Sequence, residues 1–218
     1  MNAKKVTVIG VVIALIALFF LGMKAYQSQV QATQDEHLRA DPSRLVRPHS
    51  AVLGPKDAPV TIVEFFDPAC ETCRAFHPIV KDLMAKYPQD VRLVIRYAPF
   101  HPQSDVAAKL LEAAREQDKY ETVMEAVLAT QPVWANHAKP DVERAFQAAE
   151  MVGLDVTRAR AAVAQPGMDA LLQQDIEDLQ ALKVNKTPTF FVNGRSLPSF
   201  GPDQLASLVA EEVARSKK

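Results

Sequence analysis

The 218-residue chain has only two cysteines, Cys70 and Cys73, and they are separated by Glu71 and Thr72. The run 60–66 before them is β-branched and aromatic, which predicts a buried strand. After Cys73, apolar residues recur at three- and four-residue steps, which predicts a helix. A thiol at the N-terminal end of a helix lies near free backbone N–H groups and the positive end of the helix dipole, and both stabilise a thiolate. The spacing therefore indicates a redox-active pair.

Two other roles remain open for the pair, a metal site and an inert structural disulfide. Structural zinc needs four ligands, and neither a second cysteine pair nor a histidine spacing supplies them here. A disulfide that closes so short a loop gains little chain entropy. Two thiolates also suit Cu(I), which prefers soft ligands, although the sequence has no Met-rich or His-rich tract. Redox chemistry is the favoured interpretation, and we predict neither a resident metal nor another cofactor.

An uncharged apolar run at residues 6–23 has nearly the length of a membrane-spanning helix. Lys4 and Lys5 precede it and only Lys24 follows closely, so the positive-inside rule places residues 1–5 in the cytoplasm and exports the rest of the chain. The alternative is a cleaved signal peptide with a small-residue site at 30–32. That site lies far beyond the apolar run, so we favour an uncleaved single-pass anchor. Either route delivers the cysteines to an oxidising compartment.

Residues 24–50 are polar and predict a stalk, with a helical pattern at 25–38. Residues 51–218 have the composition of an ordinary globular domain. The net charge of the chain is −1, which offers no electrostatic footprint for nucleic acid. The elements predicted after the first strand and helix are a strand at 91–97, helices within about 104–184, strands at 189–193 and near 195–197, and a helix at 202–214.

The stretch Val60–Pro78 resembles the active-site region of the DsbA-like thiol-disulfide oxidoreductases, a family of the thioredoxin superfamily. Glu64 resembles the buried acid of that superfamily, and Pro78 resembles the proline that kinks its active-site helix. Far downstream, Thr187-Pro188 and the strand predicted after them resemble the cis-proline loop that faces the cysteines. These motifs are specific when taken together.

The resemblance covers about residues 51–218 and carries an expectation for the fold. It implies an α/β, thioredoxin-like fold with an inserted all-helical domain at about 104–184, which is where the helical patterns lie. The strand, helix and strand around the cysteines agree with this, because parallel strands need a crossover connection. One N-terminal transmembrane helix, residues 6–23, precedes the domain.

Five residues are the principal candidates for the exchange chemistry. Cys70, at the helix end, is the expected nucleophile, and Cys73, one turn further, is the expected resolving thiol. Glu64 is expected to carry the proton to and from Cys73, since a desolvated carboxyl has a raised pKa; a buried acid satisfied by hydrogen bonds is the alternative. By resemblance, Thr187 and Pro188 bind an extended substrate beside the sulfurs.

Three further residues are candidates for tuning the redox pair. The strongly oxidising relatives carry Pro-His between their cysteines, whereas this chain carries Glu71 and Thr72. We expect the carboxylate of Glu71 to oppose ionisation of Cys70 and to make the protein less oxidising. His77, four residues after Cys73, is the third candidate, and its alternative is a role in capping the helix kink. His101 follows a strand end and is expected to border the substrate groove.

The leading hypothesis is an enzyme that exchanges disulfides with exported cysteine-containing proteins, most simply as an oxidase. Its expected place is the bacterial inner membrane, with the catalytic domain in the periplasm and a membrane redox partner. A disulfide reductase or isomerase fed by a membrane electron donor is the alternative. A Cu(I)-binding thiol module is the hypothesis from a different class.

Overall fold

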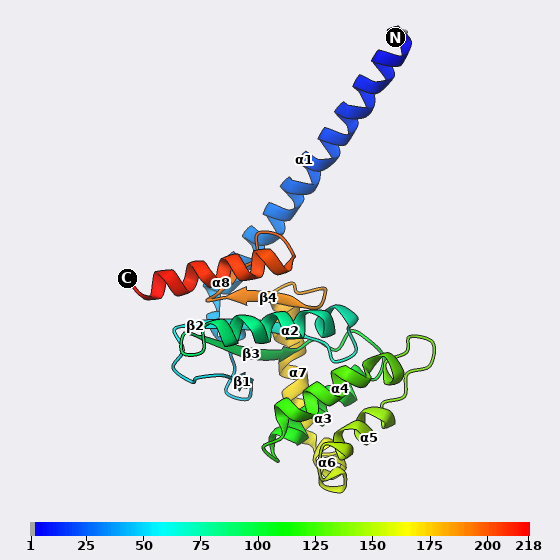
Figure 1. Ribbon diagram of the computed structural model, residues 1–218, viewed down its shortest axis with the longest axis vertical. Helices are drawn as coiled ribbons and strands as arrows, with labels where there is room; N and C mark the ends of the chain where they lie inside the picture. The colour runs from blue at the N-terminus through cyan, green and yellow to red at the C-terminus, as the bar shows by residue number, and fades with distance from the viewer. Residues whose placement is uncertain (1–2) are drawn as a thin grey trace.

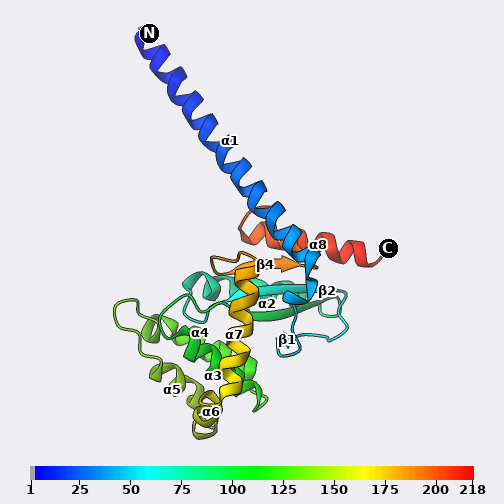
Figure 2. The ribbon, with the colours of Figure 1, turned by 180° about the vertical axis from the view of Figure 1, so that it is seen from behind.

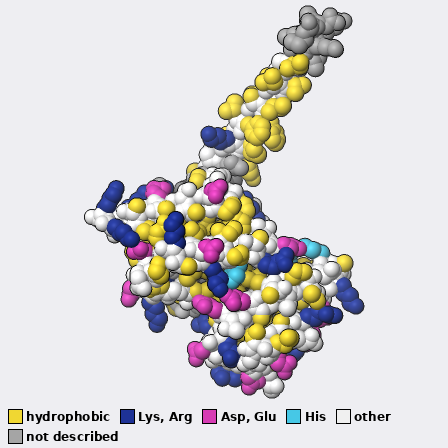
Figure 3. All heavy atoms as spheres, in the orientation of Figure 1, with side chains coloured by type: hydrophobic (Ala, Val, Ile, Leu, Met, Phe, Trp, Pro, Cys, Tyr) yellow, Lys and Arg dark blue, Asp and Glu magenta, His cyan; other side chains and the backbone are white. Residues whose placement is uncertain are grey.

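The computed structural model describes the backbone of residues 3–218 and, within the first helix, the side chains of residues 9–26, 28, 29 and 32. This helix, α1 (Ala3–Ala40), projects from the rest of the molecule (Figures 1 and 2). Its stretch Ile9–Tyr26 is apolar and long enough to cross a membrane, and none of it is buried. Apolar side chains cover this projecting part in Figure 3. The apolar run and the helical part of the predicted stalk are therefore one continuous helix.

The domain is built on a five-stranded sheet with the order β1-β3-β2-β4-β5. Only β2 and β3 pair in parallel, and the other neighbours are antiparallel. Four of the strands match the sequence prediction closely, and β2, β3 and β4 do so because each is a β-branched and aromatic run. Strand β1 was not predicted, since three residues are too few to show an alternation. The strands are β1 (Ala51–Leu53), β2 (Val60–Phe66), β3 (Val91–Tyr97), β4 (Thr189–Val192) and β5 (Arg195–Ser196).

Helices cover both faces of the sheet (Figures 1 and 2). Helices α2 and α8 pack against one face of the sheet, where the larger core cluster lies. The C-terminal part of α7 packs against the other face, where the smaller cluster lies. The remaining helices form a block between β3 and β4, where the sequence predicted them. The helices after α1 and the short 3-10 turn η1 (Pro42–Arg44) are α2 (Glu71–Lys86), α3 (Ser104–Arg115), α4 (Tyr120–Trp134), α5 (Glu143–Met151), α6 (Val156–Val163), α7 (Pro166–Ala181) and α8 (Pro202–Ser216).

The central strand β2 places one carboxyl in the core beneath the cysteines. Successive side chains of a strand point to opposite faces. Val63 and Phe65 join the cluster that packs with α7, whereas Ile62 and Phe66 join the cluster that packs with α2. Glu64 lies between Ile62 and Phe66 in the alternation, so its side chain points toward α2. Each wholly buried apolar side chain of β2 contributes about 1.5–3 kcal/mol.

A buried ion cluster fixes the segment after α1 to the domain. Arg96 of β3 is fully buried and donates to Asp175 at 2.7 and 2.9 Å and to Asp178 at 2.8 Å, both on α7. Arg47 donates to Asp178 at 2.7 Å, and His49 lies 2.8 Å from Asp175. The end of the predicted stalk therefore lies against the domain. In this cluster each aspartate carboxylate binds more than one basic side chain, so both buried charges have partners, as buried charges require.

Candidate active site

The two cysteines lie where β2 gives way to α2. Cys70 is the N-cap of α2 in an extended conformation, with φ −79° and ψ 121°, and Cys73 lies in the first turn of the helix. The backbone N–H groups of a first helical turn have no partner within the helix and point at the cap. Cys70 is 6% exposed and Cys73 is fully buried. Only the Cys70 sulfur is therefore placed to meet a substrate.

The surroundings of Cys70 stabilise its thiolate. A hydrogen bond from the Cys73 thiol is the largest cause, and the Thr187 hydroxyl and the backbone N–H groups of Thr72 and Cys73 add to it. Partial burial opposes them, yet together they lower the pKa of Cys70 to about 5. The helix end thus acts on Cys70 as the sequence predicted, through named donors. At neutral pH the reduced protein presents a nucleophile.

Cys73 and Glu64 form the buried, proton-holding side of the site. Burial is the main cause that raises the pKa of Cys73, and the hydrogen bond to Cys70 and the charge of Glu64 add to it. Burial also raises the pKa of Glu64 to about 8, with the charge of Cys70 as the second cause. Oε1 of Glu64 is buried without a hydrogen-bond partner. A carboxyl poised near neutral pH next to a protonated thiol is suited to proton transfer.

The loop before β4 brings Thr187 and Pro188 to the cysteines. The Thr187–Pro188 peptide bond is cis, as the resemblance implied. The carbonyl oxygen of Thr187 lies 3.4 Å from the Cys70 sulfur. Strand β4 pairs antiparallel with β2, which brings the two distant stretches of sequence together. Four of the predicted residues, Cys70, Cys73, Glu64 and Thr187, thus interact with one another, and Pro188 adjoins them.

The three predicted tuning residues lie in different surroundings. Glu71 and Thr72 are exposed, and Glu71 Oε1 lies 2.8 Å from Nε2 of His137, in the α4–α5 loop. The sequence treated Glu71 as an isolated carboxylate, so its proposed effect on Cys70 stays a prediction that this histidine opposes. His77 lines a cavity of about 200 Å³ between α2 and α4, and its charged neighbours there are Lys81 and Glu125.

Asp67 is a site residue that the sequence did not reveal. Its carboxylate is fully buried, and Oδ1 accepts from the backbone N–H of Ala69 at 2.8 Å. Oδ2 accepts from the backbone N–H of Phe100 at 2.8 Å and of His101 at 3.0 Å, and from Nδ1 of His101 at 2.7 Å. One carboxylate therefore ties the turn before Cys70 to the loop after β3. An aspartate in a turn is the only sequence signal, and it does not identify these partners.

Gln131 of α4 is the second residue that sequence reasoning missed. Its amide donates to the carbonyl of Pro68 at 2.7 Å and to that of Cys70 at 3.0 Å. The side chain is 1% exposed, so both bonds are shielded from water. The helical block thereby fixes the backbone that carries the nucleophile.

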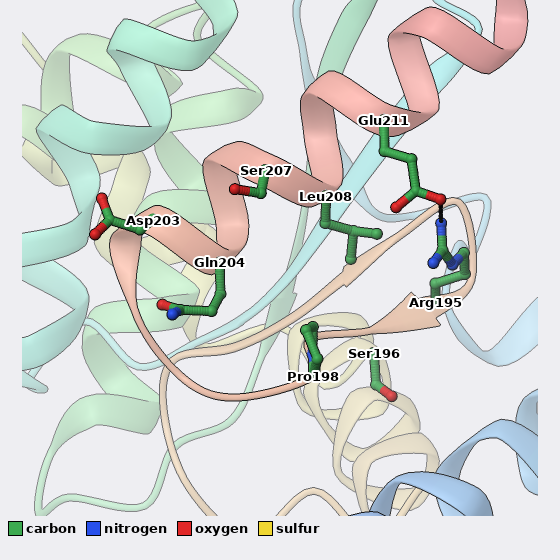
Figure 4. A pocket seen from close by; sticks show the side chains of 8 residues that line it. All are labelled: Arg195, Ser196, Pro198, Asp203, Gln204, Ser207, Leu208 and Glu211. Atoms are coloured by element: carbon green, nitrogen blue, oxygen red, sulfur yellow. Dashed lines mark hydrogen bonds and ion pairs between the residues drawn. The ribbon is translucent and has the colours of Figure 1, made fainter.

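A pocket on the surface of the domain lies away from this group of side chains. It has a volume of about 390 Å³ and lies between β5 and α8 (Figure 4). Arg195 and Glu211 lie at its wall, 2.9 Å apart. None of its lining residues is among those that surround the sulfurs. The exchange chemistry therefore belongs to the cysteine site and not to this pocket.

Comparison with known proteins identifies relatives with a thioredoxin-like fold, in agreement with the arrangement of the cysteine site. The family model described as "Thioredoxin" matches residues 47–211. The chain belongs to this thioredoxin family. A thioredoxin-like oxidoreductase of Silicibacter pomeroyi has 32% sequence identity and a TM-score of 0.69, over 81% of this chain and 98% of its own. BdbD of Bacillus subtilis has 22% identity and a TM-score of 0.68, over 76% of this chain and 94% of its own.

These likenesses confirm the predicted fold and enzyme class. The chain has a thioredoxin-like fold, which it shares with BdbD, and it is a thioredoxin-like oxidoreductase, as is the 32% identical protein of Silicibacter pomeroyi. A relative of another kind is the Na(+)/H(+) antiporter NhaA 3 of Salinispora tropica, 35% identical over 162 residues, which are 73% of this chain and 24% of the antiporter. The chain thus spans about a quarter of that curated relative's length.

The placement of the cysteines leads to a prediction about their division of labour. With Cys73→Ala, we expect Cys70 to stay trapped in mixed disulfides with substrates, because the resolving thiol is gone. With Cys70→Ala, we expect no trapped species, since Cys73 is buried and keeps its proton. Non-reducing gels of acid-quenched cells measure both outcomes. Trapping by the Cys70→Ala variant instead would reverse the assignment.

Proposed function

We propose that this thioredoxin-family protein is a disulfide oxidase for exported proteins, anchored to the membrane by α1. The observation that carries the proposal is the placement of Cys70 at the N-cap of α2, where the Cys73 thiol and the first backbone N–H groups of the helix lower its pKa to about 5. A stabilised thiolate stabilises the reduced form, so the Cys70–Cys73 disulfide is a stronger oxidant and readily accepts electrons from substrate thiols. The same chemistry runs in reverse, and the direction in the cell depends on the partner that recharges the pair.

The proposed exchange starts from the disulfide form. A substrate thiolate attacks the Cys70 sulfur, a mixed disulfide forms, and Cys73 leaves as a thiolate that takes a proton from Glu64. A second thiolate of the same substrate then attacks the substrate sulfur that is bonded to Cys70. This step releases the oxidised substrate and leaves Cys70 as the stabilised thiolate. Two electrons thereby pass from substrate to enzyme. A redox partner in the membrane must remove them before the next cycle.

Thr187 and Pro188 are proposed to receive the substrate backbone. The carbonyl of Thr187 already lies within 3.4 Å of the Cys70 sulfur, so an extended segment that reaches the sulfur runs along this loop. Proline lacks an N–H and leaves the edge of the loop free for a partner chain. Backbone pairing of this kind is tolerant of sequence, which suits substrates that share only a cysteine.

The proposed location follows from α1. Its stretch Ile9–Tyr26 is long enough to cross a membrane, and Lys4 and Lys5 favour a cytoplasmic N-terminus. The catalytic domain then faces the periplasm, where disulfides persist. Because the likeness to the antiporter covers most of this chain, a second candidate for the partner is an ion antiporter of the same membrane.

A thiol-trapping experiment in spheroplasts tests both the direction and the location. A membrane-impermeant maleimide reaches the cysteines only if the domain lies outside the cytoplasm. We expect little labelling before reduction and full labelling after it, because an oxidase rests as the disulfide. Labelling without reduction would favour the reductase or isomerase. Labelling that appears only after a Cu(I) chelator is added would favour the metal-binding module, and labelling only after lysis would contradict the location.

A further inference from the structure

Two acid–histidine pairs are anchored on Asp67 and Glu71, which flank Cys70 in the chain, and the exchange steps above use neither pair. The backbone carbonyl of Asp67 also accepts from the Cys70 N–H at 3.1 Å. Nδ1 of His101 lies 2.7 Å from Asp67 Oδ2, and Nε2 of His137 lies 2.8 Å from Glu71 Oε1. The two imidazoles meet edge to face, with ring centroids 5.8 Å apart. They come from different loops, one between β3 and α3 and the other between α4 and α5.

The ring of His101 is held in one orientation. Asp67 binds both the ring and the backbone N–H of His101, so Nδ1 is the protonated nitrogen that faces the carboxylate. The Asp67 side chain is fully buried, whereas that of His101 is 28% exposed. Nε2 is thus the nitrogen left to gain or lose a proton. A fixed ring with access to water is suited to carry a charge at a defined place.

The groups that face His101 favour its charged form. They are the carboxylates of Asp67 and Glu71 and the thiolate of Cys70, and the ring of His137 packs edge to face against His101. Burial opposes the charge, but the hydrogen bond and charge of Asp67, with the charges of Cys70 and Glu71, raise the pKa of His101 above its usual value. Coupling between two sites is reciprocal. If the Cys70 thiolate favours protonated His101, protonated His101 favours the thiolate by the same free energy.

We propose that His101, held by Asp67, is a redox-tuning residue whose imidazolium stabilises the Cys70 thiolate and makes the Cys70–Cys73 disulfide more oxidising. The inference rests on the thiol-disulfide exchange described above and adds a residue outside the C-x-x-C motif to it. His101 acts through Cys70 and is therefore a positioning and tuning residue, with no atom transferred to it. Its charge also opposes that of Glu71, the carboxylate next to the nucleophile.

The variant His101→Asn removes the charge and keeps a donor for Asp67. At about pH 6, where a histidine with a raised pKa is protonated, we expect its equilibrium constant with glutathione to favour the disulfide about three- to tenfold more than wild type. That factor corresponds to a reduction potential lower by about 15–30 mV. At about pH 9.5, where imidazole is neutral, we expect the difference to fall below about twofold.

The pH dependence separates tuning from a structural role. An equal shift at both pH values, or no shift at either, would overturn the proposal. The matched control is His137→Asn, which removes the more exposed ring of the pair, and we expect less than half of the shift. An equal shift from the two variants would assign the effect to surface charge in general. A wild-type protein that fails to titrate as a two-electron couple would contradict the exchange activity itself, which is a different result.

A measurement on the unmodified protein covers the case of a variant that does not fold. The pKa of His101, followed by NMR in the full chain, should be higher with reduced cysteines than with the disulfide, by about half to one unit. The reason is that only the reduced form places a thiolate beside the ring. Equal values in the two redox states would overturn the proposal without any substitution.

Discussion

The reduced protein should gain stability relative to the disulfide form as the pH rises from about 4 to about 8.5, by about 2–4 kcal/mol in the free energy of unfolding. The cause is Cys70, whose pKa is lowered to about 5 in the folded protein. A group with a lowered folded pKa contributes its full stability above the unfolded pKa, about 8.5 for a thiol. That contribution is lost as the pH falls through the folded value. Solvent near the sulfur screens these interactions, so the gain in the free energy of unfolding is smaller than the full pKa difference implies.

Urea unfolding of both redox forms at about pH 4, 6 and 8.5 measures this difference. The disulfide form subtracts the pH dependence of the groups whose pKa does not depend on the redox state of the cysteines, and its short loop adds only a constant of about 2 kcal/mol. Cys73→Ser and Cys70→Ser are the matched variants. The first keeps the ionising thiol and should retain the rise with pH, whereas the second should lose it. A pH-independent difference between the redox forms would contradict the lowered pKa of Cys70.

The sequence predicted the centre of the site because that part of the fold is local. Strand β2, the turn and helix α2 follow one another, so Cys70 and Cys73 reach the helix end through short-range structure alone. Glu64 faces the cysteines because the alternation of one strand decides it. The register of Thr187 and Pro188 opposite Cys70 is a distant pairing, and only the family resemblance supplied it.

The hydrogen-bond partners of the residues that support the site could not be predicted from the sequence, for a physical reason. Asp67 binds His101 across 34 positions, Gln131 binds the Cys70 carbonyl across 61, and His137 binds Glu71 across 66. Each contact depends on how the helical block packs against the sheet, and polar side chains in loops carry no periodicity that fixes their partners. Arg96 shows the same limit in the fold, because its partners on α7 lie 79 and 82 positions away.

These contacts change the reading of the C-x-x-C motif. The dipeptide between the cysteines predicts a weaker oxidant, since Glu71 adds a negative charge next to Cys70. In the folded protein His137 pairs with Glu71, and the ring of His101 packs against that of His137. We therefore expect the redox properties to depend on three segments of the chain, of which the dipeptide is one. The dipeptide alone therefore describes only part of the polar surroundings of this thiol.

Glu64→Gln should change both the pH dependence of stability and the rate of disulfide exchange, because both depend on this one buried carboxyl. Burial, the larger cause, raises the pKa of Glu64 to about 8. A carboxyl with a raised folded pKa contributes stability that is full below the unfolded pKa, about 4.3, and lost as the pH rises through the folded value. The wild-type disulfide form should therefore lose about 2–4 kcal/mol between about pH 4 and pH 8.5 through this group. Glutamine has no proton to lose, so the variant should keep that stability.

The same substitution should slow the exchange reaction. Without a carboxyl beside Cys73, the thiol has no group to give or take its proton, and general acid–base catalysis is typically worth about 10²–10⁴-fold. Because water can replace part of that role, we expect the release of Cys73 from the Cys70–Cys73 disulfide, as the mixed disulfide on Cys70 forms, to slow by about 10–100-fold near pH 7. Stopped-flow oxidation of a dithiol peptide measures the rate, and urea unfolding of the disulfide form measures the stability. A variant that is slower yet no more stable at alkaline pH would show that Glu64 is ionised and satisfied in the core. A variant that is more stable but equally fast would leave the proton of Cys73 to solvent.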